Sequence, residues 1–380
     1  MKILKFSFND SIKKIRINEI EVGNKNLLVG VSGAGKTTIM TALGKIKRIS
    51  SGTSSPGDSW SITFIDNNGC RVDWYGQFKT DTEYDEEDNA ELISESIIVD
   101  GEQLYIKKNG VSFLAGNKLP SIDKNKSIIH SLRDDDSVKD IYTCLQSIVL
   151  ISSNARNLLD ELMIPYFNES ASKTLAKEAK EDGKKMSLSL TKINELLPSL
   201  DIRHKIYFCS KYDTKQFEYF SFVFKSIFPH VKEVKPVKRR APSNSVNPKQ
   251  GVSISLVMED NSTVAQENIS SGMFKSMIII AFLYLGAKNT VLLIDEIENG
   301  LGVNCLPDII SELQGASVQT IISTHHPRII NEIKPKDWHI VTRNGGLITA
   351  SRADEIVDST SVHDPFIKLI NSKKYKLGSQ

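Results

Sequence analysis

The sequence predicts an α/β fold in which a mixed sheet carries flanking helices and a mostly helical insertion interrupts the chain. Three observations support this prediction. An apolar run over residues 27–29 leads into a glycine-rich loop and then into an apolar helical run. A second apolar run, 291–294, ends in two adjacent carboxylates. Between these runs, the alternating pattern of strands gives way to helical spacing over 125–165.

The glycine-rich loop has the spacing G-x-x-x-x-G-K-[ST] at every fixed position. Its glycines let the backbone curl so that N–H groups point at phosphate oxygens, and the helix that begins here adds its positive end. The pattern therefore predicts a nucleotide-binding P-loop, in which Lys36 reaches the β- and γ-phosphates and the Thr37 hydroxyl binds Mg²⁺. The predicted contact residues are Gly30, Ser32, Gly33, Ala34, Gly35, Lys36, Thr37 and Thr38.

Residues 1–120 are expected to form the N-terminal half of the nucleotide-binding lobe, mostly as strands. The stretch 14–21 alternates at Ile15 and Ile17 before it slips to Ile20. Residues 60–74 predict two strands about an Asn-Gly turn, and 97–113 predict further strands. The acidic stretch 80–91 is interpreted as a solvated loop without a function of its own.

Residues 121–250 are expected to form the insertion. Met186, Leu190, Ile193 and Leu197 follow helical spacing, so 171–197 is predicted to be helical and amphipathic. The aromatic-rich stretch 207–229 is typical of a packed sheet or helix face.

The insertion ends in a basic stretch over 231–250, and Pro236, Pro242 and Pro248 predict that it is an irregular loop. Two interpretations remain open: a solvated loop, or a contact with nucleic-acid phosphates. The cations concerned are Lys232, Lys235, Lys238, Arg239 and Arg240.

The second apolar run ends at Asp295 and Glu296, which is the Walker B pattern. Phosphoryl transfer to water needs neutralised charge and a positioned base. We expect Asp295 to hold Mg²⁺ and Glu296 to orient and polarise the attacking water. Buried strands often end in acids, but in combination with a P-loop the pattern favours nucleotide hydrolysis.

Three further stretches narrow the class of protein. Ser270, Ser271 and Gly272 precede an apolar helix, where a hydroxyl and backbone N–H groups form an anion site. Residues 298–301 follow the Walker B strand. His325 and His326 end a strand predicted over 320–322, and the Thr-His order favours His325 as the functional member.

The order of these motifs resembles that of ABC ATPases: Walker A, long insert, signature, Walker B with D-loop, and switch histidine. The amino-acid sequences of these motifs resemble those of the SMC/RecF/OLD-like branch, which includes AAA-family ATPases of phage-defence operons. The resemblance covers about 1–75 and 252–350. It makes 251–350 the C-terminal half of the ABC lobe and 351–380 a tail without a TOPRIM nuclease domain. Ser271 and Met273 depart from the family signature, where Gly and Gln are usual.

The resemblance implies an ATP- and Mg²⁺-dependent switch that dimerises around ATP. Ser270, Ser271 and Gly272 would act in trans, and His325 would sense the γ-phosphate. It further implies a sensor or regulator of anti-phage defence that acts with a separate effector, a nuclease or toxin. A RecF-like ATPase that clamps duplex DNA and a nucleotide-gated scaffold without turnover are the alternatives.

The amino-acid composition does not decide between these candidate functions. The formal net charge is +2, so a nucleic-acid contact would need a local patch. The four cysteines form no C-x-x-C pair, which favours buried free thiols. The N-terminus does not resemble a signal peptide, and the longest apolar run, 277–285, is too short to span a membrane. We therefore expect a cytoplasmic protein.

Overall fold

The computed structural model describes residues 1–80, 90–108, 110–120, 123–152, 167–182, 185–198, 200–240, 250–353, 365–376 and 378. The chain divides into two compact units. The first comprises Met1–Ile151, Asn289–Glu296 and Val318–Gln380, and the second comprises Ser152–Lys288 and Ile297–Ser317. Residues 251–350 contribute to both units.

The first unit is built on a large mixed sheet. Within the described residues it has fourteen strands, in the order β10-β16-β17-β3-β18-β19-β2-β1-β4-β5-β6-β7-β8-β9. The strands are β1 (Lys2–Asp10), β2 (Ile15–Glu21), β3 (Lys25–Val29), β4 (Asp58–Ile65), β5 (Arg71–Phe78), β6 (Leu92–Val99), β7 (Glu102–Lys108), β8 (Val111–Leu114), β9 (Asn117–Lys118), β10 (Ile148–Ile151), β16 (Val291–Ile294), β17 (Gln319–Ser323), β18 (Trp338–Asn344) and β19 (Leu347–Arg352).

The sheet changes character along its width. Strands β10, β16, β17, β3 and β18 run parallel, whereas β2, β1 and β4 to β9 pair antiparallel. Strand β16 is buried at all four positions, as expected for a parallel strand covered on both faces. Strand β5 instead alternates buried and less buried residues, with Val72 and Trp74 inside.

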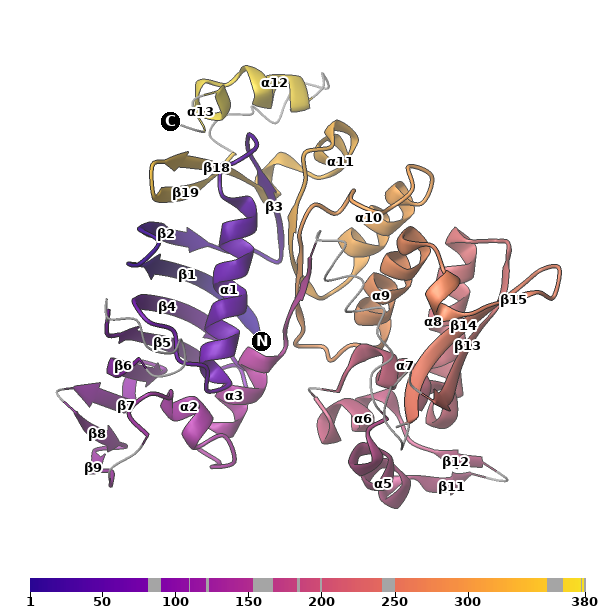
Figure 1. The fold of residues 1–380 in the computed structure, drawn as a ribbon, viewed down its shortest axis with the longest axis horizontal. Coiled ribbons are helices and arrows are strands. Elements are labelled where there is room, and N and C mark those ends of the chain that lie inside the picture. The colour runs from indigo at the N-terminus through magenta and orange to yellow at the C-terminus, as the bar shows by residue number, and fades with distance from the viewer. Residues whose placement is uncertain are drawn as a thin grey trace. The chain divides into compact units, whose positions relative to one another are not determined.

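Helices cover this sheet. Helix α1 (Lys36–Ser50) lies along one face, where Figure 1 shows it crossing β2, β1 and β4. It buries Ile39, Met40, Leu43 and Ile46 in the core of the first unit. The other helices in the described part of this unit are α2 (Ile128–Ser131), α3 (Lys139–Gln146), α11 (Pro327–Glu332), α12 (Pro365–Asn371) and α13 (Lys373–Lys376), with a 3₁₀ turn η2 (Pro335–Asp337).

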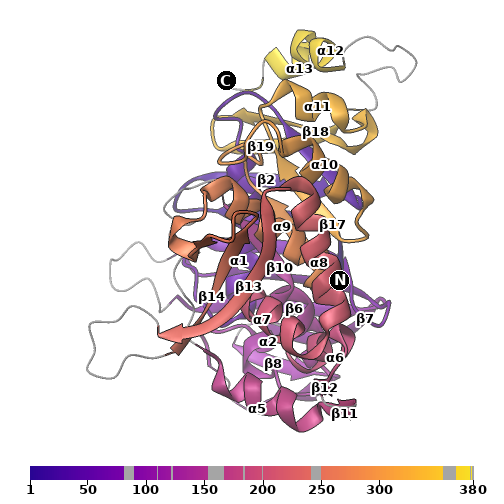
Figure 2. The ribbon, with the colours of Figure 1, turned by 90° about the vertical axis from the view of Figure 1, so that its right-hand side faces the viewer.

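The second unit combines helices with a three-stranded sheet and a two-stranded sheet among its described residues. Strand β14 lies between β13 and β15, and Figure 2 shows β13 and β14 as a long twisted pair. Its described elements are α5 (Glu169–Glu178), β11 (Lys180–Asp182), β12 (Lys185–Ser187), α6 (Leu190–Leu196), α7 (Ile202–Tyr212), α8 (Thr214–Ile227), β13 (Val231–Arg240), β14 (Gln250–Met258), β15 (Thr263–Val264), the 3₁₀ turn η1 (Gln266–Asn268), α9 (Ser271–Leu285) and α10 (Leu306–Gly315).

Two predictions in the insertion are wrong. The helix expected over 171–197 is divided into α5, the hairpin β11–β12 and α6, and Met186 lies 42% exposed in β12. The stretch 231–240 is strand β13 rather than an irregular loop. Pro236 is tolerated because, among the described residues, β13 pairs on one side only, with β14. Residues 241–249, with Pro242 and Pro248, lie outside the described residues, as do 81–89 of the acidic stretch.

Helix length and cysteine burial complete the description. In the described part of the chain, no helix has the length and apolar character needed to cross a membrane. Cys144, Cys209 and Cys305 are buried free thiols, as predicted, whereas Cys70 is partly exposed.

Candidate functional site

Three parallel strands of the first unit bring the predicted motifs to one edge of the sheet. Strand β16 pairs with β17 so that Ile294 lies beside Ile322, and β17 pairs with β3 so that Ser323 lies beside Leu28. The P-loop, the Walker B carboxylates and the histidine segment therefore all leave the carboxyl ends of adjacent strands. This edge is where open α/β sheets bind ligands.

The backbone of the P-loop depends on its glycines. Gly33 has a φ of 81° and Gly35, the N-cap of α1, a φ of 102°, both in the left-handed region. A Cβ at Gly30 would lie 2.5 Å from the main-chain oxygen of Val341 in β18. The loop thus curls at two glycines while its first glycine lets β18 approach.

Lys36 is held inside the loop. Its side chain is buried, and Nζ donates to the main-chain oxygens of Gly30 at 2.8 Å and Val31 at 3.1 Å. Helix α1 has no acidic residue in its first turn, and its Gly35 cap offers no side chain to the N-terminal N–H groups. A buried ammonium beside an uncapped helix start is suited to phosphate oxygens.

Asp295 joins the P-loop helix to the Walker B strand. Its carboxylate is buried and accepts from the Thr37 hydroxyl at 2.9 Å to Oδ2 and 3.2 Å to Oδ1. The Ser323 hydroxyl donates to Oδ1 at 2.7 Å. One hydroxyl and one carboxylate are the hard oxygen ligands that Mg²⁺ takes in P-loop proteins, where phosphates and water complete the shell. The oxygen donors of Thr37 and Asp295 therefore fit Mg²⁺.

Glu296 has an unusual backbone. Its φ is 42°, in the left-handed region that non-glycine residues rarely adopt. Its N–H donates to the Ser323 Oγ at 2.7 Å. Strained residues of this kind cluster at functional sites, where the surroundings hold them in place. The Ser323 hydroxyl thus contacts both Walker B residues, the Asp295 carboxylate and the Glu296 main chain. Ser323 was not singled out from the sequence because these contacts depend on the β16–β17 register.

The histidine pair follows β17. His325 is exposed, one residue beyond the buried Thr324, and His326 is the N-cap of α11. The His326 N–H donates to the Thr324 hydroxyl at 2.9 Å. His326 is therefore fixed at the start of α11, whereas His325 is exposed at the end of the segment that follows β17.

The predicted signature lies in the second unit. Ser270 is the N-cap of α9, and its Oγ accepts from the Met273 N–H at 3.3 Å. Ser270 and Ser271 are exposed. A Cβ at Gly272 would lie 2.4 Å from the main-chain oxygen of Gly300, so a larger residue would collide with the segment after Walker B.

The predicted basic residues are partly engaged within the second unit. Lys238 pairs with Glu169 at 3.1 Å and lies over the Phe167 ring, 3.6 Å from its centroid. Arg239 pairs with Glu267 at 2.7 Å. Lys232 and Lys235 are exposed, and Arg240 ends β13. The strand therefore presents fewer uncompensated charges than its composition implies.

Comparison with known proteins gives a partial family match. The model of a family described as "AAA domain, putative AbiEii toxin, Type IV TA system" matches residues 149–331, just under half of the chain. This stretch contains the signature, both Walker B acids and His325, whereas the P-loop lies outside it. No curated protein matches the chain.

Solved structures similar to the chain include heads of SMC proteins. An SMC head bound to the "C-winged helix domain of ScpA" is 14% identical, with 92% of this chain and 98% of that one covered and a TM-score of 0.47. The SMC head domain from Thermotoga maritima is 11% identical over 93% and 99% of the two chains, with a TM-score of 0.42. An SMC head with an extended coiled coil, bound to the C-terminal domain of ScpA and derived from Pyrococcus furiosus, is 14% identical over 92% and 96%, with a TM-score of 0.41.

The large mixed sheet, its flanking helices and the P-loop at the edge of the parallel strands establish the fold class. The family match adds a description of the central stretch as an AAA domain. The fold is that of a P-loop NTPase, and the central stretch is similar to an AAA domain.

Proposed function

We propose that the chain binds ATP with Mg²⁺ and hydrolyses it. The observation that carries this proposal is the contact between the Thr37 hydroxyl and the Asp295 carboxylate at 2.9 Å, beside the strained Glu296. Lys36 neutralises phosphate charge, and Thr37 and Asp295 hold the metal. Glu296 accepts a proton from the attacking water, while His325 hydrogen-bonds the γ-phosphate. When bound, Mg²⁺ neutralises charge on the phosphates.

We further propose that ATP joins two copies of the chain. Ser270 and Ser271 lie exposed at the start of α9, a fifteen-residue helix whose N-terminus favours anions. Together with Gly272 they would meet the γ-phosphate bound by a second copy. The P-loop would then be half of a site that is completed only in the dimer.

The biological role that we propose is a sensor or regulator of anti-phage defence, with a separate effector nuclease or toxin. The support comes from the amino-acid sequences of the motifs, which resemble those of phage-defence ATPases, and from the matched family. The description of that family names a putative toxin of a type IV toxin–antitoxin system. Function rests on the site rather than on the fold, so this part of the proposal depends on analogy.

The test is substitution of the proposed base. Glu296→Gln keeps the size of the side chain but cannot accept the proton, so this variant is expected to bind ATP, lose turnover and accumulate as a dimer. Light scattering with ATP and Mg²⁺ measures the dimer, and phosphate release measures turnover. Glu102→Gln, an exposed change on β7, is the matched control and should behave as the unaltered protein. A Glu296→Gln protein that stays monomeric with ATP would contradict the dimer proposal.

A RecF-like DNA clamp is the second candidate, favoured by exposed Lys232, Lys235 and Lys238 on strand β13. It requires duplex binding that weakens steeply with salt and is lost when Lys238, Arg239 and Arg240 become Ala. Salt-independent or absent binding would exclude it. ATP binding without phosphate release by the unaltered protein would instead favour a nucleotide-gated scaffold.

A further inference from the structure

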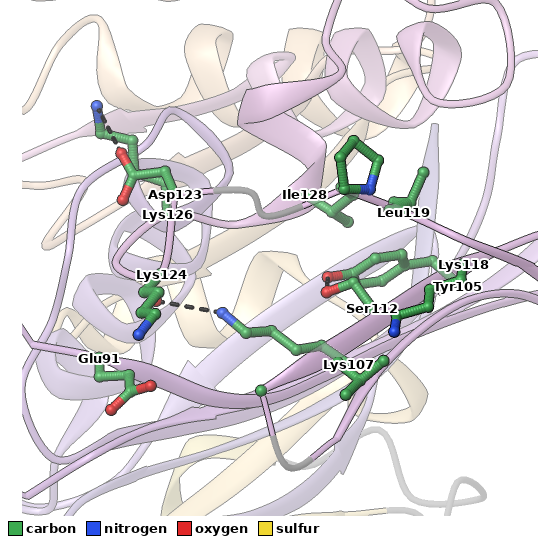
Figure 3. Close-up of a pocket in the computed structure, with 13 residues that line it drawn as sticks. Glu91, Tyr105, Lys107, Ser112, Lys118, Leu119, Asp123, Lys124, Lys126 and Ile128 are labelled. Carbon is green, nitrogen blue, oxygen red and sulfur yellow. Dashed lines mark hydrogen bonds and ion pairs between the residues drawn. The ribbon is translucent and has the colours of Figure 1, made fainter.

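A cavity of about 240 Å³ lies in the antiparallel part of the first unit, away from the P-loop edge. Its walls come from β7, β8 and residues 118–120, 123, 124, 126 and 128 (Figure 3). The volume is below that of most drug-sized pockets, which restricts an occupant to a small molecule.

The cavity is cationic. Four lysines line it, Lys107, Lys118, Lys124 and Lys126, against two acids, Glu91 and Asp123. Asp123 is already engaged by Lys126 at 3.4 Å. The remaining excess of positive charge favours an anionic occupant.

Lys107 is the least exposed of these lysines, at 8%. Its Nζ donates to the main-chain oxygen of Lys124 at 3.2 Å, the contact drawn as a dashed line in Figure 3. An ammonium carries three donors, and within the described residues the Lys124 oxygen is the one hydrogen-bond acceptor of the Lys107 ammonium. Burial lowers the pKa of Lys107, although Glu95, Glu91 and Asp123 oppose the effect. A buried ammonium is stabilised by an anion that accepts its remaining hydrogens.

The other walls add hydroxyls and an apolar surface. Tyr105 is buried, and its hydroxyl lies 3.0 Å from the Ser112 Oγ, so each can reorient toward an oxygen-rich ligand. Leu119, Pro120 and Ile128 supply apolar surface to the same cavity. Cations and hydroxyls together with an apolar wall suit a phosphate carried on a small apolar group.

The cavity has a rigid support. The carboxylate of Glu95 in β6 is 1% exposed and accepts from Trp74 Nε1 and from the Ile128 N–H, each at 2.9 Å. It therefore fixes the start of α2, which forms one wall, to the sheet that carries Lys107. Binding sites held by such supporting contacts lose little entropy when a ligand enters.

We propose that this cavity is a second ligand site, which binds a small phosphate monoester through Lys107, Lys124 and the Tyr105–Ser112 hydroxyl pair. The site is independent of the proposed ATP site, since none of its residues belongs to the P-loop or Walker B segments.

Calorimetric titration with phenyl phosphate and with inorganic phosphate tests this proposal. All protein variants in this titration carry Lys36→Ala, so that the P-loop lysine does not contribute to phosphate binding. We expect phenyl phosphate to bind more tightly than inorganic phosphate because of the apolar wall. Lys107→Gln should weaken binding about tenfold or more, the usual effect of losing a hydrogen bond to a charged group. Lys108→Gln is the matched control, because Lys108 is exposed on the same strand and does not line the cavity.

Circular dichroism shows whether Lys107→Gln folds. If it does not fold, Lys124→Gln replaces it, because Lys124 is exposed and its loss leaves the buried ammonium in place. This variant should also weaken binding while the control does not. Equal affinity in the lysine variants and the control, or no binding by the folded Lys36→Ala protein, would overturn the proposal.

Discussion

Lys275 Nζ donates to the main-chain oxygen of Asn299 at 2.7 Å and to that of Ile297 at 3.2 Å. The lysine is fully buried in α9, three residues after Gly272 of the proposed signature. Gly272 itself approaches the main chain of Gly300. The start of α9 and the segment after Walker B are therefore held together by a buried charge and by a glycine contact.

The first prediction concerns this link. Lys275→Met keeps the length of the side chain but leaves two main-chain oxygens without their ammonium donor, at a cost of about 1–3 kcal/mol in the free energy of unfolding. Because the proposed trans contacts depend on this segment, ATP turnover should fall while ATP affinity is retained. Fluorescent-nucleotide titration and phosphate release separate the two quantities. The exposed Lys288→Met is the control, and an equal loss of turnover in both variants would argue against the positioning role.

The second prediction concerns Ser323. Its hydroxyl donates to Asp295 and accepts from the Glu296 N–H, both at 2.7 Å, so Ser323→Ala removes a shared support of the two acids. We expect kcat to fall about tenfold, as one lost hydrogen bond in the transition state implies, with KM little changed. Ser351→Ala is the matched control, because the structure shows no partner for the buried Ser351 Oγ in the described chain. A change confined to KM would show that Ser323 supports binding instead.

The third prediction concerns the metal. Thr37→Val keeps the shape of the side chain but removes the hydroxyl that faces Asp295. ATP affinity in the presence of Mg²⁺ should fall about tenfold, while affinity measured in chelator should not change. Thr41→Val, exposed and one turn further along α1, serves as the control. Equal losses with and without Mg²⁺ would remove Thr37 from the metal site.

Much of the site could be predicted from the sequence because its motifs are local. The P-loop needs Gly33 and Gly35 for its curl and Lys36 for charge, and all are within one short stretch. The supporting contacts are not local. Ser323 contacts Asp295 and Glu296 only because of the register of β16 with β17. In the sequence, Lys275 is simply one polar residue in an apolar helix, and its contact with the main chain of Asn299 depends on tertiary structure.

The errors in the insertion have a similar cause. Pro236 locally favours a loop, but an edge position on a sheet, which depends on distant pairing with β14, makes a proline acceptable in a strand. Met186 follows the helical period with Leu190 and Ile193, yet it lies in β12, because the hairpin with β11 interrupts that period. Periodicity alone could not reveal either tertiary constraint.

The last prediction concerns a buried charge cluster that supports helix α1. Lys45 bonds Asp10 at 2.9 Å and Asp58 at 3.0 Å, and so ties α1 to the ends of β1 and β4. Burial raises the pKa of Asp58, and hydrogen bonds from Ser55 and Lys45 offset this only in part. For Asp10, burial is outweighed by hydrogen bonds from Lys13 and Lys45, so its pKa is lowered. For Lys45, burial is likewise outweighed by the two aspartates, and its pKa is raised.

These directions give the sign of the pH dependence. The contribution of Lys45 is present below the ordinary lysine pKa and is lost as pH rises through its raised value, whereas that of Asp10 is lost as pH falls through its lowered value. Lys45→Met leaves the buried carboxyl groups of Asp10 and Asp58 without their ammonium partner, which at pH 7 should cost about 3 kcal/mol in the free energy of unfolding. Near pH 4 the buried Asp58 is protonated more readily without the lysine, so the cost should shrink.

Urea unfolding of the unaltered protein and of Lys45→Met at the two pH values measures the difference. Lys5→Met is the control, because its ion pair with Glu19 is 36% and 54% exposed and should contribute less than about 1 kcal/mol. A cost for Lys45→Met that does not change with pH would mean that the lysine stabilises α1 through packing rather than through its charge.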